Sequence, residues 1–235
     1  MRFKVIVFPG SNCDDDMVHV LFEVIGAEVE KIWHKETSIK GLNASDCIVL
    51  PGGFAYGDYL RSGAIARFAP IMKTVITFAK KGGLVFGICN GFQVLCEAGL
   101  LPGTLLRNIH QKFLGRNVFI KKYHNRIMNE LISDTDVLDI PIAHAEGRYY
   151  ALENTLKSLE DNEQIIFKYC DHRGDFTKEA NINGSLQNIA GICNKAGNVF
   201  GMMPHPERAS EEILGNTDGR IIFESLVEES LELAG

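Results

Sequence analysis

A cysteine between two glycines is the residue of this sequence best placed to do chemistry. Residues 85–93 read VFGICNGFQ, so Cys89 follows an apolar run and precedes a helix-like segment. This is the setting of a nucleophile elbow, in which small neighbours such as Gly87 and Gly91 make room for a tight turn. The start of the helix would stabilise a thiolate, and the backbone N–H of Asn90 would be free to bind an oxyanion. The pattern therefore predicts a nucleophilic Cys89.

The remaining cysteines are interpreted as small buried hydrophobic residues, which is the usual role of a free cysteine. Three lie in apolar strand patterns, one on a helix face, and Cys13 in a loop at a strand end. The chain has no C-x-x-C pair and no cluster of histidine and cysteine, so no metal site is predicted. In chain order these cysteines are Cys13, Cys47, Cys96, Cys170 and Cys193.

Two histidine–glutamate pairs are spaced to serve a nucleophile as base and orienting carboxylate. His205 and Glu207 stand in MMPHPERA, and His144 and Glu146 stand in IAHAEGRYY. In an extended segment, side chains two residues apart point to the same side. A carboxylate beside an imidazole fixes its tautomer and raises its basicity. Spacing alone does not choose between the pairs.

The first half of the chain alternates apolar runs with helical patterns. The runs at Phe3–Phe8, Val29–Trp33, Asp46–Leu50 and Leu84–Ile88 predict strands. Helices are predicted from a Ser11-Asn12 cap to Ile25, over Ala64–Lys80 and over Gly91–Ala98. Strands that are apolar all round and alternate with helices indicate an α/β fold with a mostly parallel open sheet, covered by helices on both faces.

Sites in such sheets lie at the carboxyl ends of the strands, where Cys89 and the turn Pro51-Gly52-Gly53 are both expected. The Gly53 N–H is a candidate second oxyanion donor there, although P-G-G more commonly forms a simple turn. The second half is richer in strands, several of them interpreted as antiparallel additions, and it ends in a helix over Gly219–Leu233. These strands are predicted at Asn117–Lys121, Val137–Ala143, Gln164–Tyr169, Ile189–Cys193 and Asn198–Met202. No repeat or linker is evident, so residues 1–235 are predicted to form a single domain.

The bulk composition excludes several classes of protein. The 235 residues are 46% hydrophobic and 23% charged, which is typical of a globular domain. A net charge of −6 without a dense Lys/Arg cluster argues against a nucleic-acid-binding protein. No stretch approaches the ~20 apolar residues of a membrane span. The N-terminal apolar run is too short for the core of a signal peptide, so reduced thiols and a cytoplasmic location are expected.

Read together, several segments of the chain resemble the triad-type, class I glutamine amidotransferases, whose domain is flavodoxin-like. The resemblance is closest to the glutaminase subunits of phosphoribosylformylglycinamidine synthase, an enzyme of purine (IMP) biosynthesis, and it runs from residue 5 to near residue 209. G-x-C-x-G-x-Q alone indicates only the superfamily. One departure is Ala145, where the more usual motif reads HGEGRY. The segments are VIVFPGSNCDDD, LPGGFAYGDYLRSGAIAR, GICNGFQ, AHAEGRY and GMMPHPERA.

The resemblance implies a role for each residue that matches the family's motifs. Cys89 would be the nucleophile, His205 the general base and Glu207 its orienting carboxylate. The backbone N–H groups of Gly53 and Asn90 would bind the oxyanion, and Gln93 would help to hold glutamine. The implied reaction is hydrolysis of glutamine to glutamate and ammonia through a glutamyl thioester.

The resemblance also implies partners. Ammonia would pass to a separate synthetase subunit that uses ATP and magnesium to aminate formylglycinamide ribonucleotide, and a small third subunit is expected in the complex. No cofactor is expected on this chain, which lacks a G-x-x-x-x-G-K-[ST] loop. The segment Gly57–Arg67 carries Asp58, Arg61 and Arg67 near the predicted site. It could face the synthetase, or it could be a solvated loop and helix start.

Other classes share some of these features. Peptidase-like and chaperone-like relatives of the fold would use Cys89 with another histidine, and the segment His205-Pro206-Glu207 counts against them. A non-catalytic regulatory subunit would have no need of an intact candidate triad. A cysteine hydrolase of the dienelactone type would show Cys, Asp and His in that order, and no comparably placed Asp stands out between Cys89 and His205.

Overall fold

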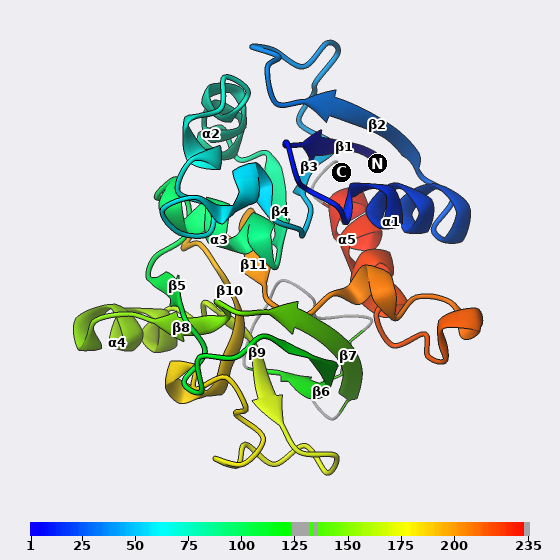
Figure 1. The fold of residues 1–235 in the computed structure, drawn as a ribbon. Coiled ribbons are helices and arrows are strands. Elements are labelled where there is room, and N and C mark those ends of the chain that lie inside the picture. The colour runs from blue at the N-terminus through cyan, green and yellow to red at the C-terminus, as the bar shows by residue number, and fades with distance from the viewer. Residues whose placement is uncertain (124–131, 134–135, 233–235) are drawn as a thin grey trace.

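A computed structural model describes residues 1–123, 132–133 and 136–232 of the chain. Within this part, one sheet of nine strands runs through the molecule in the order β2-β1-β3-β4-β11-β10-β9-β6-β7 (Figure 1). The strands from β2 to β11 in this order are parallel, and those from β11 to β7 pair in antiparallel fashion. The parallel group is β1 (Arg2–Val7), β2 (Glu28–Trp33), β3 (Asp46–Leu50), β4 (Leu84–Ile88) and β11 (Val199–Met202). The antiparallel group is β6 (Leu114–Lys122), β7 (Val137–His144), β9 (Ile165–Cys170) and β10 (Ile189–Cys193), while β5 (Thr104–Leu106) and β8 (Arg148–Tyr150) form a small second sheet.

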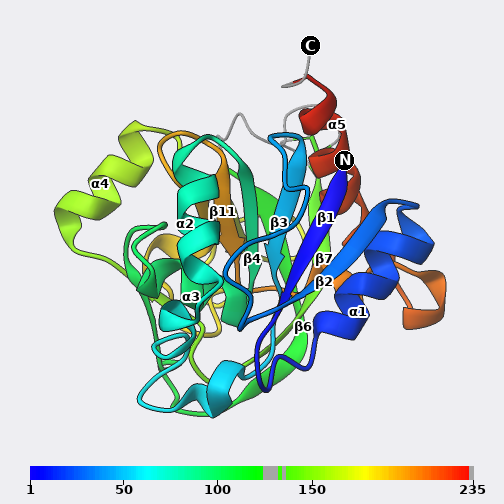
Figure 2. The same ribbon diagram turned by 90° about the horizontal axis from the view of Figure 1, so that it is seen from above.

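Helices cover both faces of the parallel part of the sheet. Figures 1 and 2 show α2 and α3 on one face and α1 and α5 on the other. This arrangement confirms the predicted α/β fold with antiparallel additions in the second half. The helices are α1 (Asp14–His19), which continues as a π-helical turn over Val20–Val24, α2 (Met72–Lys80), α3 (Asn90–Glu97), α4 (Glu153–Asp161) and α5 (Arg220–Glu232). Among the helices of the described residues, none has the length and hydropathy needed to span a bilayer.

Two local predictions were wrong. The helix predicted over Ala64–Lys80 begins only at Met72, after a 3-10 turn at Ala66–Phe68, because Pro70 disfavours helical backbone in the residue before it. Ser11 does not cap α1: its hydroxyl bonds the backbone of Phe8 at 2.9 and 3.0 Å. Helix α4 was not predicted, and Leu233, the predicted last residue of the final helix, lies outside the described residues.

Aromatic side chains tie helix α5 to the sheet. The rings of Phe86 in β4 and Phe200 in β11 are stacked with their centres 4.6 Å apart. The ring of Phe223 in α5 meets Phe86 edge-on at 6.3 Å. All three rings are buried. The two central strands that lead into the site are thus fixed by packing, which stabilises the fold through apolar burial and ring contacts.

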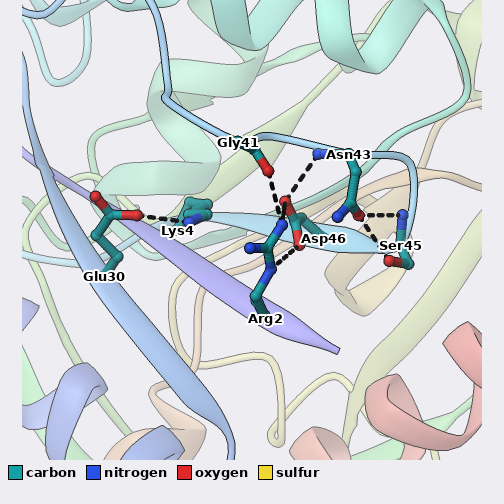
Figure 3. Close-up of polar contacts among 7 residues, drawn as sticks. All are labelled: Arg2, Lys4, Glu30, Gly41, Asn43, Ser45 and Asp46. Atoms are coloured by element: carbon teal, nitrogen blue, oxygen red, sulfur yellow. Dashed lines mark hydrogen bonds and ion pairs between the residues drawn. The ribbon is translucent and has the colours of Figure 1, made fainter.

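A polar network joins the amino ends of the first strands (Figure 3). Arg2 at the start of β1 donates to both carboxylate oxygens of Asp46 at the start of β3, at 2.9 and 3.0 Å, and to the carbonyl of Gly41 at 2.7 Å. Lys4 pairs with Glu30 of β2 at 2.5 Å. These contacts lie at the opposite strand ends from Cys89, so the carboxyl ends remain available for a site.

Candidate active site

Cys89 stands on a strained turn at the carboxyl end of β4. Its backbone has φ +49° and ψ −103°, a conformation that costs free energy in a residue with a side chain. The turn is held because the Cys89 N–H donates to the carbonyl of Met202 at 2.7 Å, while β3 and β11 flank β4. The thiol is buried, with Sγ 3.8 Å from the carbonyl of Ala143. Cys89 thus has the geometry of a nucleophile elbow.

The flanking glycines let α3 begin directly against the sheet. A Cβ on Gly91 would lie 1.9 Å from the carbonyl oxygen of Leu50 at the end of β3. A Cβ on Gly87 would lie 2.7 Å from the backbone of Gly91 and 2.5 Å from the side chain of Leu95. Real Cβ atoms do not approach other atoms so closely, so both positions require glycine. The interpretation of these glycines as room for the turn is confirmed.

His205 and Glu207 form a buried pair. Nδ1 of His205 lies 2.6 Å from Oε1 of Glu207, and both residues are about 1% exposed. The backbone N–H of His205 donates to the carbonyl of Pro141 in β7 at 2.8 Å, which anchors the segment beside the antiparallel strands. The segment is a 3-10 turn over Pro206–Arg208 and not the extended chain that the sequence reasoning assumed. The turn still places the carboxylate on the imidazole.

Opposing effects act on the pKa of His205, and the result is a pKa well above the ordinary value. Burial lowers it, but the charges of Glu207 and Cys89 and hydrogen bonding raise it by more. Nε2 of His205 is buried and has no hydrogen-bond partner among the described residues. A catalytic contact is often loose before substrate binds, so this nitrogen suits a base that closes on Cys89 during the reaction.

His144 does not pair with Glu146. Its Nδ1 lies 3.1 Å from Oδ1 of Asn108, an oxygen that also accepts from the N–H of Gly147 at 3.0 Å. The Asn108 amide nitrogen donates to the carbonyls of Lys112 and His144, which fixes the amide's orientation. Nδ1 of His144 therefore carries the hydrogen, and Nε2 is a buried acceptor with no hydrogen-bond partner in the described part of the chain. Burial, aided by the charge of nearby His205, lowers the pKa of His144 to about 3, so its ring is neutral.

Glu146 instead fastens a neighbouring loop. Its Oε2 accepts from the hydroxyl and the N–H of Ser62 at 2.9 and 3.2 Å, and Oε1 lies 3.6 Å from Arg107. Of the two pairs that the sequence left open, only His205–Glu207 has the carboxylate on the imidazole.

The Gly52-Gly53 turn lies against the His205 ring. A Cβ on Gly52 would be 2.6 Å from Cε1 of His205. Gly53 has φ +126°, and a Cβ there would be 2.6 Å from the backbone nitrogen of Asn12. The turn is thus packed between the imidazole and the loop after β1, beside the elbow. The binding of an oxyanion by the N–H groups of Gly53 and Asn90 stays a prediction.

Asn90 and Gln93 tie α3 to two loops. Asn90 Oδ1 accepts from the N–H of Ala55 at 3.0 Å, and Nδ2 donates to Asp58 at 3.1 Å and to Gln93 Oε1 at 2.9 Å. Gln93 Nε2 donates to the carbonyl of Glu146 at 2.6 Å. Both ends of the Gln93 amide are therefore engaged within the protein, and its contact with glutamine stays a prediction.

Cys13 and Arg208 lie at this site without having been predicted for it. Cys13 is buried, and its Sγ accepts from Nη2 of Arg208 at 3.0 Å. Three side chains that can bind metal ions meet here: the Sγ of Cys13, a ring nitrogen of His205 and a carboxylate oxygen of Glu207 lie within 4.8 Å of one another. His205 and Glu207 already bond each other at 2.6 Å, which leaves no room for an ion between them, so we interpret the group as a polar network. The available sequence signal was the place of Cys13 at the carboxyl end of β1.

Comparison with known proteins places this geometry in a family. Residues 1–222 match the family model described as a CobB/CobQ-like glutamine amidotransferase domain. The chain is 56% identical to the phosphoribosylformylglycinamidine synthase subunit PurQ of Moorella thermoacetica, over 97% of this chain and 96% of that protein. It is also 56% identical to the PurQ subunit of Chlorobaculum parvum, over 96% of this chain and 89% of that protein.

Solved structures agree with this placement. A chain of the structure of PurLQS from Thermotoga maritima superposes with a TM-score of 0.83 at 38% identity, covering 97% of both chains. A glutamine amidotransferase of Thermotoga maritima shares the fold at a TM-score of 0.56 and 16% identity, covering 99% of this chain and 93% of that one. The chain therefore belongs to the class I glutamine amidotransferase family, in the group of the PurQ subunits of phosphoribosylformylglycinamidine synthase.

Proposed function

We propose that this chain hydrolyses glutamine with the triad Cys89, His205 and Glu207 and supplies the ammonia to the synthetase subunit of phosphoribosylformylglycinamidine synthase. The observation that carries the proposal is the buried His205–Glu207 pair, bonded at 2.6 Å, beside an elbow cysteine with φ +49°. A nucleophile, a base within reach and a group that orients the base form the arrangement that covalent catalysis requires.

In the proposed reaction, the Cys89 thiol gives its proton to His205, and the sulfur attacks the side-chain amide carbon of glutamine. The oxyanion that forms is held by the N–H groups of Gly53 and Asn90, and one such donor typically contributes about 3 kcal/mol to the step. His205 gives its proton to the departing ammonia, leaving a glutamyl thioester on Cys89. The same imidazole then takes a proton from water, which attacks the thioester and releases glutamate. Glu207 stabilises the imidazolium each time it forms.

The other residues of the site support this chemistry. We propose that Gln93, fixed by Asn90 and by the Glu146 carbonyl, shapes the pocket that holds glutamine. Residues 1–235 act as a single domain, and the chain needs no cofactor of its own. ATP and magnesium belong to the synthetase subunit, a small third subunit completes the complex, and the complex works in the cytoplasm. The similarity to a chain of PurLQS over 97% of both chains supports this assembly.

The segment Gly57–Arg67 is the part of the chain that we propose to face the synthetase. Leu60 and Tyr59 in this segment are 93% and 73% exposed. The neighbouring Asp58 accepts from Asn90, directly after the nucleophile, so binding here can be communicated to the site. Arg61, one of the charged residues that drew attention to this segment, forms two hydrogen bonds with Glu97 at 2.8 Å. The exposed apolar side chains are therefore the better test of this surface.

Glutamate release from glutamine tests the proposal. It is measured for the chain alone and with its cognate synthetase, the small subunit, ATP and formylglycinamide ribonucleotide, beside the Cys89→Ala variant. We expect release that rises in the complex and is abolished by Cys89→Ala, since the variant lacks the attacking sulfur. Release that is indifferent to Cys89, or absent under every condition, would contradict the proposal.

A further inference from the structure

The sulfur of Cys13 lies beside the catalytic pair but has no part in the proposed reaction. Cys13 directly precedes α1 and is 2% exposed. Sγ of Cys13 and the His205 ring both lie next to Gly52. A Cβ on Gly52 would be 3.3 Å from Sγ of Cys13 and 2.6 Å from Cε1 of His205. Sγ, a ring nitrogen of His205 and a carboxylate oxygen of Glu207 lie within 4.8 Å of one another. The sulfur and the imidazole therefore converge on the same small space.

Arg208 holds this sulfur. Its Nη2 donates to Sγ of Cys13 at 3.0 Å, and its Nε lies 3.5 Å from Oδ2 of Asp16 in α1. Burial lowers the pKa of Arg208, but the charges of Cys13, Glu207 and Asp16 raise it by more, so the guanidinium stays charged. Arg208 directly follows Glu207 in the chain. The contact therefore links the loop after β1 to the turn that carries the base and its carboxylate.

The loop that carries Cys13 is itself fixed. Two of its carbonyls accept from the loop after β3: Gly10 from the N–H of Phe54 at 2.9 Å and Pro9 from the N–H of Tyr56 at 2.6 Å. Gly53 packs so closely on Asn12 that a Cβ on Gly53 would be 2.6 Å from its backbone nitrogen. Cys13 thus projects from a backbone that cannot easily shift.

The His205 ring needs a second point of support. Glu207 holds Nδ1, but a ring bonded at one nitrogen can still tilt about that bond, and Nε2 has no partner of its own among the described residues. We propose that Cys13 is a positioning residue: its sulfur, clamped by Arg208, supports the edge of the imidazole that faces Gly52, so that Nε2 stays turned toward Cys89. This inference rests on the proposed glutaminase function.

Three variants of the chain, each assembled with the cognate synthetase and small subunit, test this role. Cys13→Ala should lower kcat for glutamate release at least about tenfold, because small misplacements of a catalytic group are costly. The KM for glutamine should stay within about twofold, because the support acts on the base and not on substrate binding. Cys13→Ser should recover part of kcat, since its hydroxyl can accept from Arg208. Cys47→Ala, at a fully buried cysteine of β3, should leave kcat unchanged.

Two further measurements separate positioning from packing. The melting temperature should fall similarly in Cys13→Ala and Cys47→Ala, although only the first loses activity. Arg208→Gln should lower kcat as Cys13→Ala does, and the double variant should lose less than the two single effects combined, because both act through one contact.

The outcomes are distinguishable. If Cys89→Ala is inactive but the Cys13→Ala complex keeps the parental kcat, the role of Cys13 is overturned and the proposed function stays intact. The role would also be overturned if Cys13→Ser were no more active than Cys13→Ala and if the losses of kcat followed the losses in melting temperature. An active Cys89→Ala would overturn the proposed function and this inference with it.

Discussion

The imidazole of His205 and the carboxylate of Glu207 meet at 2.6 Å with both side chains buried. Glu207→Gln keeps the size of the side chain but removes its charge. We expect kcat for glutamate release to fall by a factor of about 10²–10⁴, as when the carboxylate of a catalytic triad is neutralised. Steady-state kinetics of the assembled complex measures this. Glu146→Gln is the matched control, because Glu146 contacts Ser62 and not a histidine, and an equal loss there would contradict the assignment.

The same variant should change the pH dependence. Burial lowers the pKa of His205, yet Glu207 and Cys89 raise it well above the ordinary value, so removing the Glu207 charge lets the imidazolium lose its proton at a lower pH. The alkaline limb of the kcat/KM profile should move to lower pH in Glu207→Gln. Because the pKa of His205 is higher in the folded state, protonation of His205 stabilises the fold. This stabilisation is complete at a pH below the unfolded-state pKa of about 6.5, and it is lost at a pH above the raised folded-state pKa. The difference in melting temperature between parent and variant should therefore be largest at mildly acidic pH and shrink as pH rises.

His144 should remain neutral where ordinary histidines are protonated. Its pKa is lowered to about 3 by burial and by the charge on His205, and Asn108 holds its hydrogen on Nδ1. Nitrogen NMR of the labelled chain should show the Nδ1–H tautomer unchanged from pH 8 to about pH 5, a range in which exposed histidines titrate. Titration of His144 near pH 6.5, or the opposite tautomer, would contradict this geometry.

Gly91→Ala should disrupt the elbow. The added methyl group would lie 1.9 Å from the Leu50 carbonyl, so α3 would have to move away from β3. We expect destabilisation of about 3 kcal/mol or more, at or above the upper end of ordinary overpacking because the obstacle is backbone. Thermal or urea unfolding measures it. Gly115→Ala is the control, since its new Cβ would meet only a side-chain atom of Phe113 at 3.5 Å. Equal stability of the two variants would argue against the close approach of α3 to β3.

Leu60→Asp should weaken binding to the synthetase without unfolding the chain. Leu60 is 93% exposed and stands two residues after Asp58, which accepts from Asn90 beside the nucleophile, so a charge at Leu60 costs the fold little but would oppose an apolar contact. Calorimetry or surface binding with the purified synthetase measures the affinity. Ile213→Asp provides the control at a side chain that is 90% exposed outside the segment Gly57–Arg67. If both variants bind as the parent does, the segment Gly57–Arg67 is not part of the interface.

The sequence alone determined the frame of this protein, because the signals are local. Cys89 between Gly87 and Gly91 predicted the elbow, since a strand that turns directly into a packed helix tolerates only small neighbours. Apolar runs separated by glycine and proline located the strands of the parallel sheet. The start of α2 was predicted too early in the chain, because the effect of Pro70 on its neighbours outweighed an apolar pattern that suited a helix.

The tertiary structure decided which side chains meet. His144 and His205 have the same local spacing to a glutamate. The His144 ring hydrogen-bonds Asn108, which is 36 residues away in the chain, whereas the His205 ring hydrogen-bonds Glu207. Cys13 reaches Arg208 across 195 residues, a contact that exists only once β1 and β11, the strands before the two residues, lie in one sheet. Spacing along a strand or turn is set by backbone geometry and can be read from the sequence. Partners from distant segments are selected by packing and burial, which the fold as a whole determines.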